Sequence, residues 1–469
     1  MRSCWSKLLV GLGLLVVILF GLWLYFDIKY QHMIDAELAR IRAEGWPVTA
    51  AECAPEPVPD KQNAAVLYQQ VFQVDFDAPD PWAGSVLLPD IDSDLIKAFR
   101  EQPTPEIKKQ VHTLLTDPET TKVLQILREA SERPYSVFPI HWEKGGESIT
   151  IAPIAKFRKA CFLISLRALA SARAKRIGEA LDWCRVGLRM SKHVAAEHTL
   201  VAELVSIAMN SIIIGEAEGF LDTAAVSPQD ARQMENYLRQ IDLRAHFTKA
   251  MITERALGLA EFRVFHDNPT ICYYTFCPQY PDIPEEFSEM LPGCRDLHSK
   301  AAARTYCSRF GWPLQKLDQL HYLTMMREQI ELSKQPYYLT KSSYDAREQT
   351  LEDMPSYQAP VTRIMTTTYG RAAAKRDHSI AQIALFRVVL ALKAYKYERR
   401  AYPEGLAQLQ QTLSWQLPQD PFSGNSFVYR RKGNGFKLYS LWSDLDDDGG
   451  EPIEKHRYQD GDIVWECHR

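Results

Sequence analysis

An uninterrupted apolar stretch near the N-terminus constrains this chain more than any other feature. Residues 8–26, LLVGLGLLVVILFGLWLYF, contain no charged side chain. A helix needs about 20 apolar residues to cross the hydrocarbon core of a bilayer. Arg2 and Lys7 precede the stretch and no acidic residue does, and basic residues beside a membrane helix are retained in the cytoplasm. We therefore expect residues 1–7 in the cytoplasm, a transmembrane anchor over residues 8–26, and the rest of the chain on the far side.

A cleaved signal peptide is the main alternative to an anchor. Such peptides have an apolar core of about 7–15 residues, followed by small residues at the cleavage site. The run here is longer and closes with the bulky residues 23–26, WLYF. A lipoprotein signal does not fit, because Cys4 lies before the apolar run and not after it. No second uncharged run of this length follows, so we expect an uncleaved signal anchor that crosses the membrane once.

The composition is that of a globular protein with an ordinary core. The chain has 469 residues, enough for two or three domains. It is 46% hydrophobic and 24% charged, both typical of globular proteins. A net charge of −4, with no basic run interleaved with aromatic residues, argues against nucleic acid as a partner.

Eight of the nine cysteines follow the apolar stretch, where an oxidising compartment would let disulfides persist. Cys161 and Cys184 fall on consecutive expected helices at heights about 12 Å apart, given 1.5 Å per residue, so we expect buried thiols. Cys53 and Cys467 have no assignment. The other four contain no C-x-x-C pair, which makes zinc the weaker interpretation, and we expect two disulfides of open connectivity. These four are Cys272, Cys277, Cys294 and Cys307.

Helical signals dominate from residue 64 to residue 400. Thr104, Asp117 and Ser227 each place a capping oxygen before a proline, which is a common start of a helix. Residues 154–227 lack proline and repeat apolar side chains at helical spacing. A mainly α fold follows, with strand signals only after Tyr402. Besides the proline-free region, we expect helices over residues 28–44, 64–72, 228–243, 245–264, 314–334 and 361–400, with irregular chain between the last two.

The last ninety residues carry an ordered set of motifs. A helix over residues 379–400 leads into YPEGL, then DPF with a following glycine, two strand signals joined by KGNG, an acidic loop and a closing DIVW. This order resembles the globular module of the type II secretion major pseudopilin. The resemblance implies a small antiparallel sheet covered on one face by the helix. The N-terminal anchor lacks the glutamate of pseudopilins and the similar helix lies in mid-chain, so we do not interpret the chain as a pilus subunit.

Two further resemblances concern the rest of the chain. Residues 168–191 resemble one tetratricopeptide-type hairpin, although irregular antiparallel helices around one core are the favoured interpretation. The layout of anchor, helical body and pseudopilin-like tail also resembles a group of uncharacterised membrane-anchored bacterial envelope proteins, as do residues 55–68 and 198–212. The expected division is residues 1–7, 8–26, 27–63, 64–265, 266–313 (a cysteine-rich insertion), 314–378 and 379–469.

An aspartate cluster in the tail predicts a metal site. Asp444, Asp446 and Asp448 precede Gly449 in the pattern D-x-D-x-D-G, the first half of an EF-hand-type loop. Calcium prefers six to eight such oxygen ligands in flexible geometry. The twelfth position is a lysine, so the second half does not fit an EF-hand. The pseudopilin resemblance implies a different completion, by Asp460 or Asp462 just before the last strand. The alternative is a solvated acidic turn without an ion.

Catalytic motifs are missing from the sequence. There is no G-x-S-x-G, P-loop or G-x-G-x-x-G pattern. His193, Glu197, His198 and Glu203 are expected on one helix, but H-x-x-x-E-H matches no zinc metalloprotease motif. We therefore name no catalytic residue and no cofactor-binding residue apart from the calcium ligands.

These features favour a non-enzymatic interaction or scaffold protein. We expect it on the bacterial cytoplasmic membrane, with the bulk of the chain periplasmic, a calcium-stabilised tail, and a protein partner in a secretion or pilus-like assembly. Two alternatives stay open: an extracytoplasmic hydrolase with its site in the helical body, and a purely structural envelope protein.

Overall fold

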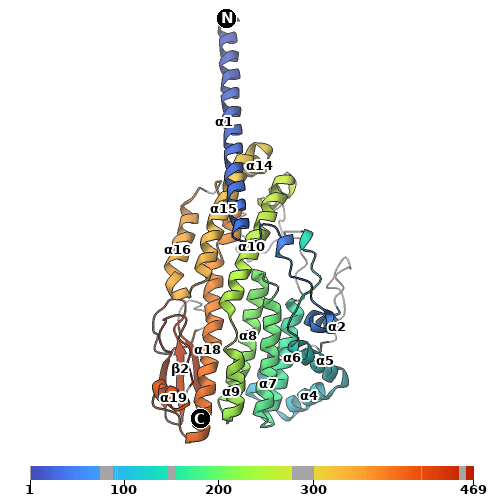
Figure 1. Ribbon diagram of the computed structural model, residues 1–469, viewed down its shortest axis with the longest axis vertical. Helices are drawn as coiled ribbons and strands as arrows, with labels where there is room; N and C mark the ends of the chain where they lie inside the picture. The colour runs from blue at the N-terminus through green and yellow to red at the C-terminus, as the bar shows by residue number, and fades with distance from the viewer. Residues whose placement is uncertain are drawn as a thin grey trace.

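A long helix projects from one end of an elongated, mainly helical body (Figure 1). This helix, α1 (Arg2–Ala43), is continuous. Its residues 9–22 are exposed all round, whereas its second half packs against the body. The computed structural model describes residues 2–73, 88–89, 91, 93–144, 154–276, 300–355, 357–413, 415–453 and 461–468.

The second half of α1 is tied to α15 (Trp312–Ser333) by two ion pairs. Asp27 Oδ1 lies 2.7 Å from Lys316 Nζ. Further along α1, Glu37 forms an ion pair with Arg327. These ion pairs fix the second half of α1 against the body. The exposed apolar half therefore projects from a helix whose other end, the stem of α1 (residues 27–43), is held in place. The helix expected over residues 28–44 is therefore confirmed, and it is continuous with the apolar stretch before it.

Three helical segments in the described chain are long and apolar enough to cross a membrane: Leu9–Ala43, Leu200–Leu221 and Pro360–Arg399. A helix that is apolar all round is either a membrane span or a core helix. In the apolar windows of the second and third segments 61% and 78% of the residues are buried inside the fold, whereas the window of the first contains no buried residue. Burial places the second and third in the core, and the N-terminal helix is the one whose exposed apolar surface fits a membrane anchor.

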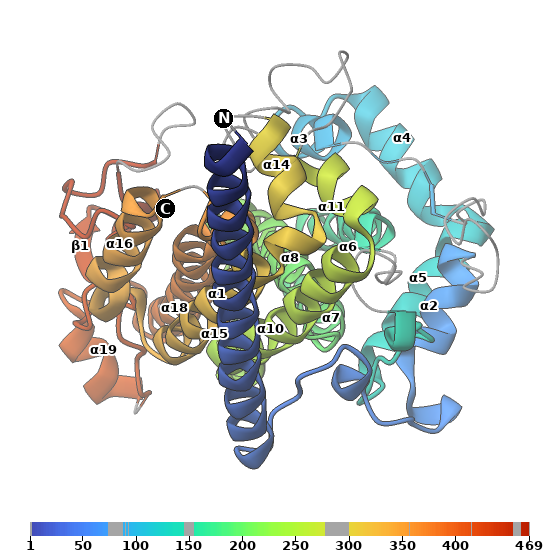
Figure 2. The ribbon, with the colours of Figure 1, turned by 90° about the horizontal axis from the view of Figure 1, so that it is seen from above.

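The body is a bundle flanked on both sides by smaller elements. Figure 2 shows α2–α5 on one side of the central helices and the C-terminal sheet on the other. The helices before residue 243 are α2 (Ala64–Phe72), α3 (Ser93–Glu101), α4 (Pro105–Thr116), α5 (Pro118–Glu132), α6 (Ile154–Arg173), α7 (Ile177–Ala195), α8 (Leu200–Leu221) and α9 (Pro228–Leu238). Those after it are α10 (Leu243–Asp267), α11 (Pro269–Phe276), α14 (Lys300–Tyr306), α15, α16 (Tyr337–Asp353), α17 (Pro360–Thr366), α18 (Tyr369–Arg399) and α19 (Leu406–Leu413).

The predicted helix starts are confirmed by their caps. Thr104 accepts from the Ile107 backbone N–H at 3.3 Å, and Asp117 accepts from that of Thr120 at 2.9 Å. Ser227 does the same for α9. In each case a proline follows the cap, where its missing N–H costs no intrahelical bond. Local chemistry alone therefore fixes these three starts.

The centre of the bundle is formed by α6, α7 and α8, with α10 and α18 against α8. Gly187 on α7 permits close packing, because a Cβ there would lie 2.4 Å from Ile213 Cδ1 on α8. Ser191 on α7 donates to the Ser206 carbonyl on α8 at 2.9 Å. One continuous apolar core extends from these helices into the C-terminal strands.

The C-terminal sheet has three antiparallel strands in the order β1-β2-β3. They are β1 (Val428–Lys432), β2 (Gly435–Ser440) and β3 (Ile463–Cys467). Gly433, in the two-residue turn between β1 and β2, has φ 56°, which glycine adopts without steric cost. Phe386 of α18 stacks on Trp465 of β3 with ring centroids 5.6 Å apart. The expected sheet, hairpin and covering helix are confirmed.

Three expectations for the helical region are wrong: one helix end, one helix that is divided in two, and one stretch expected to be irregular. α9 ends at Leu238, several residues before the expected 243. The expected helix over 361–400 is two helices, α17 and α18. The stretch before it is not irregular, because it forms α16. Only four α16 side chains are buried, three of them polar or aromatic, so its apolar repeat was too weak to detect; they are Tyr337, Thr340, Tyr344 and Leu351.

One disulfide joins Cys272 and Cys307, whose Cα atoms are 5.6 Å apart. It links α11 to the end of α14 and closes the described part of the cysteine-rich insertion. Cys277 and Cys294, the other two disulfide candidates, lie outside the described residues. Cys161 and Cys184 are buried thiols, as expected.

Candidate functional site

The aspartate loop between β2 and β3 gathers carboxylates at one point. One oxygen from each of Asp444, Asp446 and Asp448 lies within 4.8 Å of the others. Positive φ angles at Leu445 (73°) and Gly449 (74°) curl the loop. Three like charges at this distance repel one another unless protons or a cation neutralise them.

Asp462 joins the same loop from the start of β3. Its Oδ2 accepts from the Gly450 N–H at 2.7 Å, while its buried Oδ1 has no hydrogen-bond partner among the described residues. Asp444 Oδ1 is also buried, and no described residue donates a hydrogen bond to it. Burial, together with the nearby carboxylates of the loop, raises the pKa of Asp462 to about 6. Burial, followed by Asp446, raises the pKa of Asp444.

This donor set fits a hard cation that takes oxygen ligands. Two buried carboxylate oxygens without a donor, beside two further carboxylates, are what a calcium ion would satisfy. The oxygens of Asp444, Asp446 and Asp448 converge and would hold it, whereas Asp462 lies outside that group and would have to move closer to join them. Asp460, the other predicted ligand, lies outside the described residues.

The predicted histidine and glutamate helix is wrong. α7 ends at Ala195, and the chain turns through His198, which has φ 58°, before α8 begins. Thr199 caps α8 by accepting from the Ala202 N–H at 3.2 Å, a helix start that we overlooked in the sequence. His193 therefore lies on α7 and Glu203 on α8, and the two do not share one helix.

His193 has a structural role. Its Nε2 lies 3.0 Å from the Arg133 carbonyl oxygen, so Nε2 carries the proton, and Nδ1 accepts from the Tyr68 hydroxyl at 2.8 Å. Burial lowers the pKa of His193 to about 4. A neutral ring with both nitrogens engaged ties α7 to α2 and to the end of α5.

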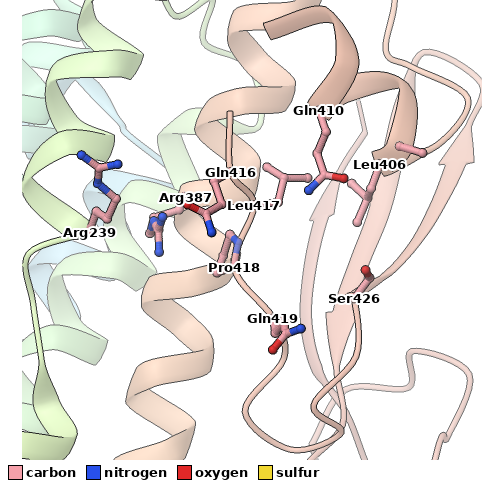
Figure 3. Close-up of a pocket in the computed structure, with 10 residues that line it drawn as sticks. Arg239, Arg387, Leu406, Gln410, Gln416, Leu417, Pro418, Gln419 and Ser426 are labelled. Carbon is pink, nitrogen blue, oxygen red and sulfur yellow. The ribbon is translucent and has the colours of Figure 1, made fainter. Parts of the chain in front are cut away.

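A polar pocket of about 700 Å³ lies where the body meets the C-terminal module (Figure 3). Arg239 and Arg387 lie on the body side, with Gln410 of α19 opposite them. Arg387 is engaged by Glu235, with its guanidinium 2.9 Å from the carboxylate. The described lining holds hydrogen-bond donors and amides and no histidine, thiol or carboxylate.

A larger groove of about 1040 Å³ runs between α3–α4 and the ends of α6–α8. Its described lining contains no acidic residue. An adjoining pocket of about 280 Å³ shares residues 223–225 with this basic groove and continues to the end of α18. The cationic side chains of the two are Arg100, Lys108, Arg167, Arg173, Lys175, Arg176, Lys393, Lys396 and Arg400.

No protein-family model, no curated protein and no solved structure matches the chain.

The basic groove was missed by our sequence interpretation. Part of it is visible as the short run 173–176, RAKR, at the turn between α6 and α7. The run was too short to stand out in an acidic chain. Lys108 and Lys396 lie far from it in sequence, and the fold brings all three segments to the same end of the molecule.

Proposed function

We propose that the protein is a membrane-tethered interaction protein. The observation that carries this proposal is α1, whose apolar half is exposed and whose other half is fixed to the body. The polar pocket and the basic groove are lined mainly by arginine, lysine, glutamine and apolar side chains, with His112 in the groove, which supports binding in preference to catalysis. By the charge asymmetry around the anchor, the body lies outside the cytoplasm, in the periplasm of a bacterium.

A second apolar group at the depth of the anchor supports the membrane assignment. Phe310 is 81% exposed. Its carbonyl accepts from the Trp23 indole N–H at 3.0 Å, near the end of the exposed apolar run. Tryptophan is enriched where a membrane helix meets the headgroups. Phe310 would therefore touch the outer surface of the bilayer, and the bilayer boundary would lie at Trp23.

Two measurements test the tether and its orientation. The full chain is expected to stay in the membrane pellet after alkaline carbonate extraction. Protease added to intact spheroplasts is expected to degrade the body, because it lies outside the cytoplasm. A chain released by carbonate, or a body that the protease reaches only after lysis, would contradict the proposal.

The C-terminal module is proposed to bind calcium as a structural ion. Its helix, sheet and acidic loop follow the order implied by the pseudopilin resemblance, which supports a link to a secretion or pilus-like assembly as the partner. The ion would offset the repulsion between the carboxylates and join the loop to β3. In vivo crosslinking of the full chain, read out by mass spectrometry, tests that link, and recovery of no component of such an assembly would remove it.

Calcium removal is the first prediction. With calcium bound, hydrogen exchange in residues 440–453 and 461–468 is expected to slow, because the ion holds the loop against β3. Asp444→Asn, which deletes one ligand charge, is expected to weaken calcium binding on the order of tenfold. Glu404→Gln, an exposed carboxylate of the same module, serves as the matched control and should bind calcium normally. Identical exchange with calcium and with chelator would show that the loop is a solvated acidic turn.

A further inference from the structure

The basic groove lies at the end of the body farthest from the anchor. Figure 1 places α4 and the end of α18 at that end, opposite the projecting half of α1. The whole chain carries a net charge of −4, yet neither the groove nor the adjoining pocket has an acidic residue in its described lining. The concentration of cations there is therefore local and runs against the overall charge.

Some of these cations are neutralised within the fold. Arg100 lies 2.8 Å from Glu216, and Arg167 and Arg176 both pair with Glu179. Their charges help to hold the helices around the groove and are less available to a ligand.

Three exposed cations have no carboxylate partner among the described residues: Lys108, Arg173 and Lys175. Arg173 lies over the Phe99 ring, with 5.0 Å from the guanidinium carbon to the centroid, and donates to the Arg100 carbonyl. These bonds orient it and leave its charge uncompensated. Arg400 adds another exposed cation at the far end of the adjoining pocket.

The walls between the cations are apolar. Phe99, Val111, Leu115 and Phe220 line the groove. Each is at least nine-tenths buried, so these side chains are held in place by the fold and present only a narrow apolar edge to the groove. The combined volume of groove and pocket exceeds what a small anion fills, since even drug-sized ligands occupy sites of about 300–1,000 Å³.

We propose that this groove binds an acidic, amphipathic polypeptide segment of a partner protein. Its carboxylates would meet Lys108, Arg173 and Lys175, and its apolar side chains would pack on the wall at Phe99 and Phe220. Charge complementarity of this kind speeds encounter and excludes cationic partners. The inference deepens the proposed interaction function and rests on it. The position of the groove, at the end opposite the anchor, removes it from bilayer lipid.

Peptide binding to the full chain in nanodiscs tests the proposal. The probe is a fluorescein-labelled peptide in which pairs of leucine and glutamate alternate, and its comparison is the same peptide with glutamine for glutamate. We expect saturable binding of the acidic peptide alone, read by fluorescence anisotropy. Binding should weaken as salt rises from about 50 to about 300 mM, because exposed charges are screened.

Charge variants locate the binding. Lys108→Glu combined with Lys175→Asn should weaken binding by about tenfold. The first change turns an attraction between Lys108 and a peptide carboxylate into a repulsion, and the second removes the ion pair made by Lys175. Asparagine is chosen because Lys175 has φ 61°, which asparagine tolerates. Lys109→Glu is the matched control: Lys109 is exposed on α4 but does not line the groove, so affinity should change by less than about twofold.

Three outcomes would overturn the inference. These are no saturable binding of the acidic peptide, equal binding of the glutamine peptide, and equal losses in Lys109→Glu and the double variant. None of them affects carbonate extraction or the calcium measurement, so failure of the groove is distinguishable from failure of the proposed function. Melting curves of the variants confirm that each remains folded.

Discussion

Glu203 is a carboxyl group buried in the middle of the bundle. It lies on α8 with 1% of its surface exposed, and neither carboxylate oxygen has a hydrogen-bond partner among the described residues. Burial raises its pKa to about 8 from an ordinary value of 4.5. Because the folded state holds this proton more tightly than the unfolded state, its contribution to stability is complete below pH 4.5. That contribution is lost as the pH rises toward 8.

Replacing this group gives a pH-dependent prediction. Glu203→Gln keeps the shape and removes the ionisation, so its stability relative to the native chain should rise between pH 5 and pH 8. The change in that difference should be on the order of 1 kcal/mol or more, since one pKa unit corresponds to about 1.4 kcal/mol. Thermal melts of both proteins at the two pH values measure it. A difference independent of pH would show that Glu203 is solvated or paired in solution.

At the scale of single residues, the sequence did not predict contacts between residues that are distant in the chain. The spacing of Asp444, Asp446 and Asp448 predicted their convergence because they are neighbours. The unsatisfied oxygen of Asp462 was not visible, and neither was the pairing of His193 with Tyr68, 125 residues earlier. Both depend on how the bundle closes, and a local pattern does not contain that.

Helices whose ends are set by neighbouring residues in the sequence were predicted well. Contacts with other helices that cap a helix end were not. α2 has the predicted bounds, and proline-linked caps fixed the starts of α4, α5 and α9. The start of α17 was predicted to within one residue, at 361 against the observed Pro360, but the source of its cap was not, because the cap comes from another helix. Asp318 of α15 accepts from the Val361 N–H at 2.9 Å and from the Thr362 N–H at 3.1 Å. No pattern within residues 360–366 reports a cap 42 residues away.

This remote cap gives a prediction for α17. Asp318 is fully buried and also accepts from the Tyr306 hydroxyl at 2.7 Å and from that of Thr362 at 2.6 Å. Asp318→Asn places an NH2 group among donors, so we expect a loss of about 2 kcal/mol or more in unfolding free energy. Hydrogen exchange at residues 361–366 should accelerate. Asp345→Asn, an exposed carboxylate on α16, should change stability by less than about 0.5 kcal/mol. Unchanged exchange in α17 would contradict the role.

For the molecule as a whole, the sequence predicted the composition of the fold better than its assembly. The apolar N-terminus, the helical majority and the late small sheet followed from periodicity and turn residues. The placement of α8 and α18 at the centre did not, because an apolar helix surface alone does not show which other helices it packs against. Buried polar side chains such as Asn210 and Lys393, each bonded within the fold, mark them as core helices.

The final prediction concerns α1 as both anchor and structural helix. Ile34 and Ile41 are each 2% exposed, and burying one such side chain stabilises a fold by about 1.5–3 kcal/mol. A chain of residues 27–469 should therefore leave the membrane yet melt within a few degrees of the full chain. A chain of residues 46–469 loses both isoleucines and the ion pairs to α15, and it should melt markedly lower. Equal melting of the two truncations would show that the stem of α1 does not belong to the body. A 27–469 chain that stays in the membrane pellet would show that the exposed apolar half is not what holds the protein to the bilayer.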